Sequence, residues 1–136
     1  MSHSMNPTPP VNHPPIVELK SVGKSFRSAD GAPRQVLADV DFTLREHEIV
    51  ALLGQSGSGK STLLRIMAGL VQADGGEVLY RQQPLHGPAR GIGMVFQSFA
   101  LFPWLTVQQN VEIGLEARGM AAAERAAKAA VAIELI

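Results

Sequence analysis

The chain has 136 residues, of which 46% are hydrophobic and 18% are charged, a composition that suits one modest globular domain and excludes a wholly disordered or fibrous protein. Twelve Lys and Arg residues balance twelve Asp and Glu residues, so no overall charge would attract nucleic acid or an anionic membrane. The lack of cysteine excludes disulfides, thiolate metal ligands and a cysteine nucleophile. No apolar stretch in the sequence approaches the roughly 18 residues that a membrane-spanning helix needs.

The first fifteen residues differ from the rest of the chain. They hold five of the nine prolines and have neither the basic start nor the apolar centre of a secretory signal peptide. We therefore expect residues 1–15 to form a disordered, proline-rich tail and residues 16–136 to form the folded region.

Alternating apolar and polar residues at 16–21 and at 40–44 predict two half-exposed strands. A turn-rich stretch at 28–33 predicts a loop between them. The run Glu48–Leu53 is short and nearly continuously apolar, which is typical of a strand that is buried on both faces. We therefore expect a parallel sheet to follow the two half-exposed strands.

Helix and strand patterns alternate further along the chain. Apolar residues recur at helical spacing over 60–68, which predicts a helix that ends at Gly69. Strands are predicted over 77–80 and over 92–96, with a Gly- and Pro-containing connection between them.

Two helices are predicted in the last part of the chain. Thr106 opens a capping-box pattern, so we expect a helix to begin there and to end at Gly119. An alanine-rich helix is predicted from Ala121, where Glu124 and Lys128 have the spacing of a favourable helical charge pair.

A glycine-rich loop joins the apolar run to the first predicted helix. Its spacing is G-x-x-x-x-G-K-S with a further threonine, and its residues are Gly54, Gln55, Ser56, Gly57, Ser58, Gly59, Lys60, Ser61 and Thr62. Glycines let successive backbone amides point at phosphate oxygens, and the start of the helix adds its positive end. Lys60 would contact the β- and γ-phosphates of a nucleotide, and the Ser61 hydroxyl would ligate Mg²⁺. The sequence therefore predicts a nucleotide-binding loop.

Competing motifs fail on their spacing. A dinucleotide fingerprint that starts at Gly57 would need a third glycine where Thr62 stands. His47 and Glu48 lack the second histidine of a zinc-protease motif. No G-x-S-x-G nucleophile elbow is present in the right setting.

The residues around the loop resemble one family of phosphate-loop proteins. Residues 49–70 look like the ATP-binding subunit of ABC transporters, and residues 91–97 look like the strand that leads into the Q-loop of that family. Residues 101–107 are similar to its nitrate, sulfonate and taurine importer branch. The resemblance implies an α/β, P-loop NTPase fold: the N-terminal part of an ABC-type nucleotide-binding domain, with an antiparallel β subdomain and a parallel-sheet core that carries the Walker A helix.

The same resemblance assigns two further site residues and two cofactors, ATP and Mg²⁺. Phe26 matches the A-loop aromatic that stacks on adenine, although an apolar residue at a strand end is more often part of a core. Gln97 would ligate Mg²⁺ through its amide oxygen and sense the γ-phosphate, whereas without the resemblance it is an ordinary polar residue at the end of a strand.

Three kinds of protein partner are implied by the resemblance. Ser98–Val107 would face the membrane subunit of the transporter, with Phe102 or Trp104 in the contact; packing of these residues against the helix from Thr106 is the equally balanced alternative. A second ATP-binding subunit would complete a homodimer, and a periplasmic or extracellular solute-binding protein would act indirectly. The subunit would sit on the cytoplasmic face of the membrane as a peripheral protein.

Three elements that this family uses for hydrolysis have no match: a Leu-Ser-Gly-Gly-Gln signature, a Walker B strand ending in Asp-Glu, and a switch histidine. Gly75-Gly76 and His86 lie in predicted turns, and Glu134 lies in a helix-prone stretch. We therefore expect an incomplete, N-terminal fragment with no catalytic residue of its own, in which Lys60 supports phosphate. Such a chain would bind MgATP without hydrolysing it alone.

The implied function is the ATPase subunit of an ABC importer, which couples ATP hydrolysis to uptake of a small solute such as nitrate, a sulfonate or taurine. Two alternatives stay open at this point. One is a nucleotide-binding or regulatory module that does not hydrolyse ATP. The other is a different phosphate-loop NTPase or a small kinase, against which the Gln97 strand and the Pro103-Trp104 loop argue.

Overall fold

A computed structural model describes residues 13–97 and 101–135. The chain divides into two compact units, with the boundary between Met94 and Val95. The elements in chain order are β1 (Pro15–Arg27), β2 (Pro33–Arg45), α1 (Lys60–Met67), β3 (Gly75–Tyr80), β4 (Gln83–Pro84), α2 (Val107–Glu116) and α3 (Ala122–Glu134). Most of the expected tail, residues 1–12, lies outside the described residues. Within the described ranges, every helix is too short or too polar to cross a bilayer.

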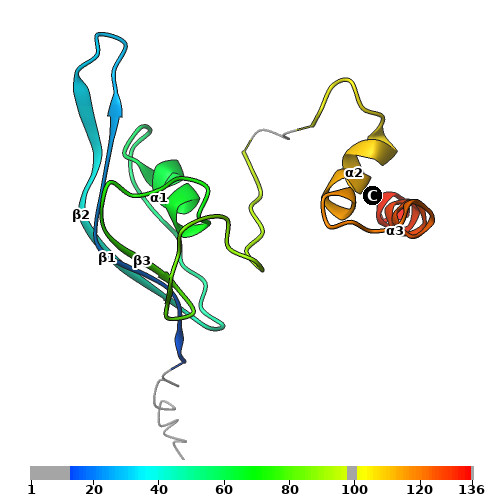
Figure 1. Cartoon of the computed structure of the whole chain (residues 1–136), viewed down its shortest axis with the longest axis horizontal. Helices are drawn as coiled ribbons and strands as arrows, with labels where there is room; N and C mark the ends of the chain where they lie inside the picture. Colours follow the sequence, from blue (N-terminus) through cyan, green and yellow to red (C-terminus); the bar gives the residue numbers. More distant parts are fainter. Residues whose placement is uncertain (1–12, 98–100, 136) are drawn as a thin grey trace, which may run out of the picture. The chain divides into compact units, whose positions relative to one another are not determined.

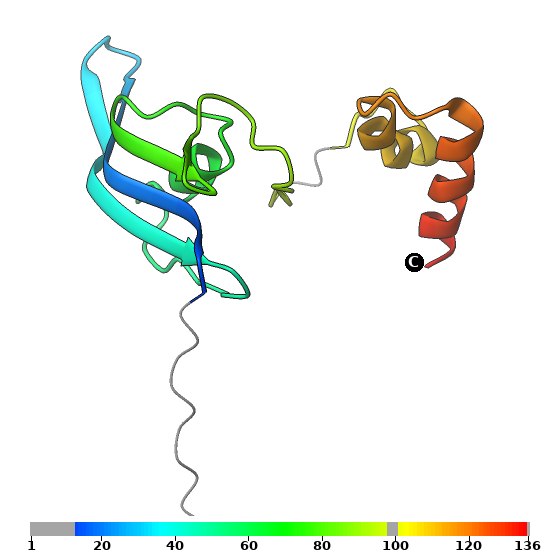
Figure 2. The ribbon, with the colours of Figure 1, turned by 60° about the horizontal axis from the view of Figure 1, so that its bottom comes forward.

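The first unit is built on an antiparallel sheet with the strand order β2-β1-β3-β4. β1 and β2 form a long hairpin, and β3 runs beside β1 on its other edge (Figures 1 and 2). The strands predicted at 16–21, 40–44 and 77–80 are confirmed, and all three are longer than predicted. The sheet therefore supplies the antiparallel subdomain that the sequence predicts.

Helix α1 is held against this sheet by a small apolar core. Leu19 and Val22 of β1 and Leu37 of β2 are buried in one cluster with Leu63 and Ile66 of α1. The spacing of the two helix residues places both on one face of α1. Burial of each such side chain contributes about 1.5–3 kcal/mol, so the core fixes where the helix begins relative to the sheet.

The predicted strands at 48–53 and 92–96 do not form, and this part of the prediction is wrong for the structure. Ile49 is 99% exposed, Leu53 92% and Val95 99%. A strand needs hydrogen-bonded neighbours, and no described strand lies beside either run. Leu52 alone of the first run packs against the core of the first unit. The parallel part of the expected sheet is therefore not formed by the described residues.

The second unit is a helical hairpin made of α2 and α3. Thr106 and Gln109 form the predicted capping box, with Gln109 N–H donating to Thr106 Oγ1 at 3.2 Å and Thr106 N–H donating to Gln109 Oε1 at 2.9 Å. Gly119, with φ of +76°, follows the end of α2. The predicted charge pair on α3 is also confirmed, because the Lys128 ammonium lies 2.8 Å from Glu124.

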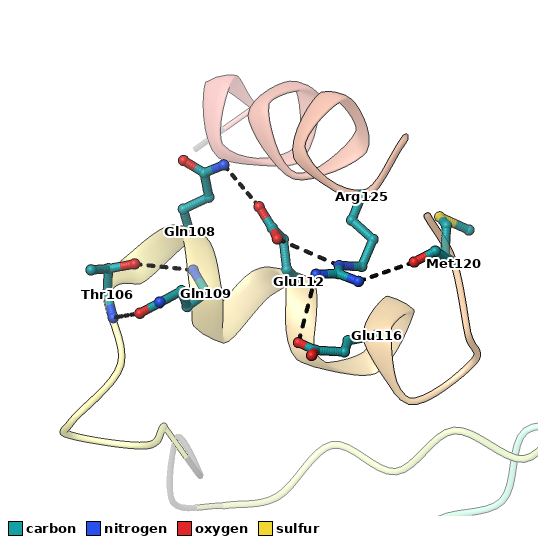
Figure 3. Close-up of polar contacts among 7 residues, drawn as sticks. All are labelled: Thr106, Gln108, Gln109, Glu112, Glu116, Met120 and Arg125. Atoms are coloured by element: carbon teal, nitrogen blue, oxygen red, sulfur yellow. Dashed lines mark hydrogen bonds and ion pairs between the residues drawn. The ribbon is translucent and has the colours of Figure 1, made fainter. Parts of the chain in front are cut away.

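Arg125 joins the two helices and was not predicted. Figure 3 shows its guanidinium reaching from α3 to two glutamates of α2 and to the connection between the helices. Its Nε lies 3.6 Å from Glu112 Oε2, its Nη2 lies 3.9 Å from Glu116 Oε2, and its Nη1 donates to the carbonyl of Met120 at 3.0 Å. The Glu112 side chain is only 14% exposed, so Arg125 is the cation that lies beside a largely shielded carboxylate.

Replacing Arg125 tests whether this network holds the hairpin together. Arg125→Ala leaves the shielded Glu112 carboxylate without its cation, and we expect the free energy of unfolding of the second unit to fall by about 1–3 kcal/mol. Urea titration followed by tryptophan fluorescence measures this, because Trp104 is the single tryptophan and lies in this unit. Lys128→Ala, which removes an exposed pair, is the matched control and should cost about 0.5 kcal/mol or less. Equal losses in the two variants would contradict this role for Arg125.

Candidate phosphate-binding site

The loop 54–59 is seated on β2 through Gly59. The pairing of β1 with β2 shifts by one residue between Lys24–Leu37 and Ser25–Gln35, which leaves Val36 as the extra residue of a β-bulge. A Cβ built at Gly59 would lie 3.0 Å from the carbonyl oxygen of Val36 and 2.9 Å from a methyl group of Leu37. Gly59 also has φ of +93°. Glycine is therefore required at 59 for both close approach and backbone conformation.

The Lys60 side chain folds back and bonds the first residues of the loop. Its ammonium donates to the carbonyl oxygens of Gly54 at 2.8 Å and Gln55 at 2.7 Å, and lies 3.3 Å from Ser58 Oγ. A Cβ at Gly54 would lie 2.9 Å from the same Ser58 hydroxyl, so this glycine keeps the two sides of the loop together. The result is a cationic group placed at the start of α1.

The start of α1 presents donors and no carboxylate. The N-cap, Gly59, makes no side-chain capping bond, and the first turn holds no acidic residue. The first-turn amides of a helix have no partner within the helix, and they carry the positive end of its dipole. Together with the Lys60 ammonium and the loop hydroxyls, they form a donor set that fits an anion such as a phosphate chain.

The donor set fits Mg²⁺ only as a companion of phosphate. Ser61 offers a hydroxyl beside the loop, and its side chain is exposed. Among residues 13–97 and 101–135, no group of three His, Cys, Asp or Glu residues is arranged to hold a metal ion. Mg²⁺ commonly takes few protein ligands and completes its shell with waters and phosphate oxygens, which agrees with a single hydroxyl.

The structure brings most of the predicted site residues into one unit. Gly54 to Thr62 form one continuous loop and helix start, and Phe26 lies in the same unit near the end of β1. Gln97 belongs to the second unit, where its side chain is exposed. The predicted metal pair of Ser61 and Gln97 is therefore divided between units that the structure describes separately.

Phe26 is not a core residue in the structure. Its side chain is 44% exposed, which disagrees with the alternative that it is simply packed inside. It pairs with Arg34 of β2, two residues before the bulge at Val36 that contacts Gly59. The strand pair that carries Phe26 therefore also supports the phosphate loop.

Two residues beside Phe26 were missed by the sequence prediction. The Lys24 ammonium lies 5.4 Å from the centre of the Phe26 ring and 2.5 Å from Asp74 Oδ1. The hydrogen bond from Lys24 and a second one from the Ser25 amide lower the pKa of Asp74 below its usual value, so the carboxylate stays ionised. Lys24 was detectable in principle, because residues two apart in a strand share a face. Asp74 carries no such local signal.

A hollow elsewhere in the first unit has a different character. It lies between the end of α1, β3 and β4, and Val71, Gln72, Leu85 and His86 are among its lining residues. Among the described residues that line it, Glu77 is the one carboxylate and none is a lysine or an arginine. It is therefore less suited to a phosphate chain than the loop at 54–62.

The expected partner segment is partly described. Residues 98–100 lie outside the described residues, whereas Leu101 is 66% exposed, Trp104 75% and Val107 70%. The rings of Trp104 and Phe102 are 5.4 Å apart between centroids. Phe102 is more covered, at 38% exposed, so Trp104 and its neighbours Leu101 and Val107 present most of the apolar surface of this segment.

Asn110 shapes this segment. Its Oδ1 accepts from the Phe102 amide at 2.8 Å, and its Nδ2 lies within 3.0–3.2 Å of the carbonyl oxygens of Phe102, Leu105 and Thr106. The Asn110 side chain therefore holds the turn that precedes α2, and Trp104 lies in this turn.

Known proteins resemble this chain over most of its length. The sequence profile described as ABC transporter matches residues 37–136. The taurine import ATP-binding protein TauB of Pseudomonas putida is 40% identical over 121 residues, 89% of this chain and 45% of that protein. The spermidine/putrescine import ATP-binding protein PotA of Salmonella typhimurium is 41% identical over 125 residues, 90% of this chain and 32% of that protein.

A solved structure supports the same relationship. The dimeric, post-hydrolysis structure of the ATP-binding cassette MJ0796 bound to ADP and Pi matches with a TM-score of 0.74 and 32% sequence identity, over 87% of this chain and 56% of that chain. The chain spans less than half of the length of the curated relatives named above. The profile match, together with the phosphate loop at the start of α1, shows that this chain belongs to the ABC transporter family.

Proposed function

We propose that this chain binds MgATP at residues 54–62 as part of the ATPase subunit of an ABC importer. The observation that carries the proposal is the loop itself: Lys60 is held by neutral carbonyl oxygens at the start of a helix whose first turn lacks any carboxylate. A phosphate chain binds a lysine ammonium more strongly than carbonyl oxygens do. The loop is therefore ready to exchange its internal contacts for a triphosphate.

Each site residue has one task in this proposal. Lys60 neutralises the β- and γ-phosphates, while the loop amides and the start of α1 hold the phosphate chain. Ser61 would hold Mg²⁺, which supplies charge neutralisation between the phosphates when it is bound. Phe26 would stack on the base. Gln97 is proposed as a second protein ligand of Mg²⁺, through its amide oxygen.

Hydrolysis is proposed for the whole transporter subunit and not for these residues alone. The chain has no match to the signature, the Walker B strand or the switch histidine, and its relatives are more than twice as long as the matched part. We infer that the described site positions the nucleotide and that turnover needs elements from outside it.

Partners follow from the same family membership. The exposed segment 101–107 is proposed to contact the membrane subunit, with Trp104 in the contact. The related cassette MJ0796 is dimeric in its solved structure, which supports a second ATP-binding subunit as partner here. A solute-binding protein would act through the membrane subunit, and the subunit would lie peripherally on the cytoplasmic face of the membrane.

The proposed solute is of the nitrate, sulfonate or taurine type. The match to TauB, named for taurine import, covers 89% of this chain. PotA, named for spermidine and putrescine import, is equally similar. The solute proposal therefore depends on the similarity of residues 101–107, which include Pro103 and Trp104, to the nitrate, sulfonate and taurine importers. Transport measurements on the intact transporter would decide which solute is carried.

Calorimetric titration of MgATP into the chain tests the proposed function. Lys60→Ala removes the charge at the phosphates, and we expect affinity to fall by about tenfold or more. Lys20→Ala is the matched control, because Lys20 lies in the same unit but pairs with Glu77 on an exposed strand face. A parallel phosphate-release assay should stay at background. Binding that survives Lys60→Ala, or steady Lys60-dependent phosphate release, would contradict the proposal.

A further inference from the structure

One aspartate fixes the strand end that carries Phe26. Asp74 lies directly before β3, and its Oδ2 accepts a hydrogen bond from the Ser25 amide at 2.7 Å. Its Oδ1 lies 2.5 Å from the Lys24 ammonium, and its own amide donates to the Gly23 carbonyl at 2.9 Å. Three consecutive residues of β1 are therefore held by a single side chain and its backbone.

Backbone geometry delivers Asp74 to this place. Gly76 has φ of +81°, and a Cβ there would lie 2.3 Å from the carbonyl oxygen of Ser21, so β3 begins in very close contact with β1. Gly75, the first residue of β3, pairs with Gly23 of β1. The carboxylate that precedes these glycines is thereby set beside the end of β1.

Lys24 connects Asp74 to the aromatic ring of Phe26. Its ammonium lies 5.4 Å from the centroid of Phe26, within the range at which a cation is attracted to an aromatic face. The Lys24 side chain is only 14% exposed, whereas Phe26 is 44% exposed. The lysine is thus fixed by its carboxylate partner, and the ring keeps surface that a planar base can cover.

We propose that Asp74 is a positioning residue for nucleotide-base recognition, which holds Lys24 against the Phe26 ring and fixes the end of β1 so that the ring is set to stack on a base. A ring that is ordered before the base arrives loses less conformational entropy on binding. The inference rests on the proposed function, because the base belongs to a nucleoside triphosphate whose phosphates occupy the loop at 54–62.

Asp41 offers an internal comparison. Asp41 lies on β2, and its Oδ1 accepts a hydrogen bond from the Ser21 amide at 2.8 Å, so it also holds an amide of β1 with a carboxylate oxygen. No ion pair to a lysine is found for it among the described residues. Asp41→Asn therefore perturbs β1 in a similar way without acting on Phe26.

The test compares two ligands that share their phosphate chemistry. Mg²⁺–ATP carries a base and Mg²⁺–tripolyphosphate does not, so a change in base stacking alters the Kd of the first alone. Asp74→Asn keeps an oxygen for the Ser25 amide and removes the charge that holds Lys24. We expect it to weaken ATP binding by about three- to tenfold and to change tripolyphosphate binding by less than about twofold. Asp41→Asn should leave the ratio of the two Kd values unchanged.

Phe26→Ala completes the cycle. It should remove the preference for ATP over tripolyphosphate, and Asp74→Asn added to it should then have no further effect on the ratio of the two Kd values. A further change in that ratio when Asp74→Asn is added to Phe26→Ala would overturn the proposal, because Asp74 would then act on base binding without Phe26.

Lys24→Gln is the second variant and decides the outcome if Asp74→Asn loses both ligands. It removes the cation while Asp74 remains on the Ser25 amide. A loss confined to ATP supports the proposal, and an equal loss of both ligands overturns it, because a purely structural role predicts that result. An unaltered chain that binds neither ligand would instead overturn the proposed function, and this inference with it.

Discussion

The phosphate loop, the first helix and the sheet meet at Gly59, where no side chain fits. The bulge in β2 turns the carbonyl of Val36 toward this residue, and Leu37 of the same strand presses on it while also joining the core with α1. The position of the helix start is thereby fixed by packing that lies beneath the loop. Anion binding by the loop depends on this contact of Gly59 with β2, because the contact sets the position and direction of the positive end of α1.

The first unit holds two of its lysines in opposite ways. Lys60 is bound to neutral carbonyl oxygens, so its charge stays uncompensated and available to an incoming anion. Lys24 is bound to the ionised carboxylate of Asp74, so its charge is balanced and its place is fixed. One lysine is suited to exchange its partner for a ligand. The other is suited to stay where it is, beside the Phe26 ring.

Local patterns correctly predicted the elements that find their partners within the described chain. The strands at 16–21 and 77–80 pair with each other in the sheet, and the helix after the loop and the capping box at Thr106 depend on neighbours close in sequence; all are present. The runs at 48–53 and 92–96 were predicted from apolarity alone, and a strand also requires a partner that the described chain does not place beside them.

The site residues also fall into a group that local sequence predicted and a group that it did not. The spacing of Gly54 to Thr62 was sufficient to predict the loop, because its function is encoded in consecutive residues. The pairing of Lys24 with Asp74 joins positions 50 residues apart, and no periodic pattern reports such a contact. The first half of β2 was also missed, because the bulge at Val36 interrupts the alternation on which strand prediction depends.

Amide chemical shifts of the ¹⁵N-labelled chain, recorded before and after addition of Mg²⁺ and ATP, test the central claim most directly. Binding through the loop predicts that the largest changes fall on the amides of residues 57–62, with a second group at the end of β1 around Phe26. Unchanged loop amides would contradict the account, as would changes centred on the hollow around Gln72 and His86.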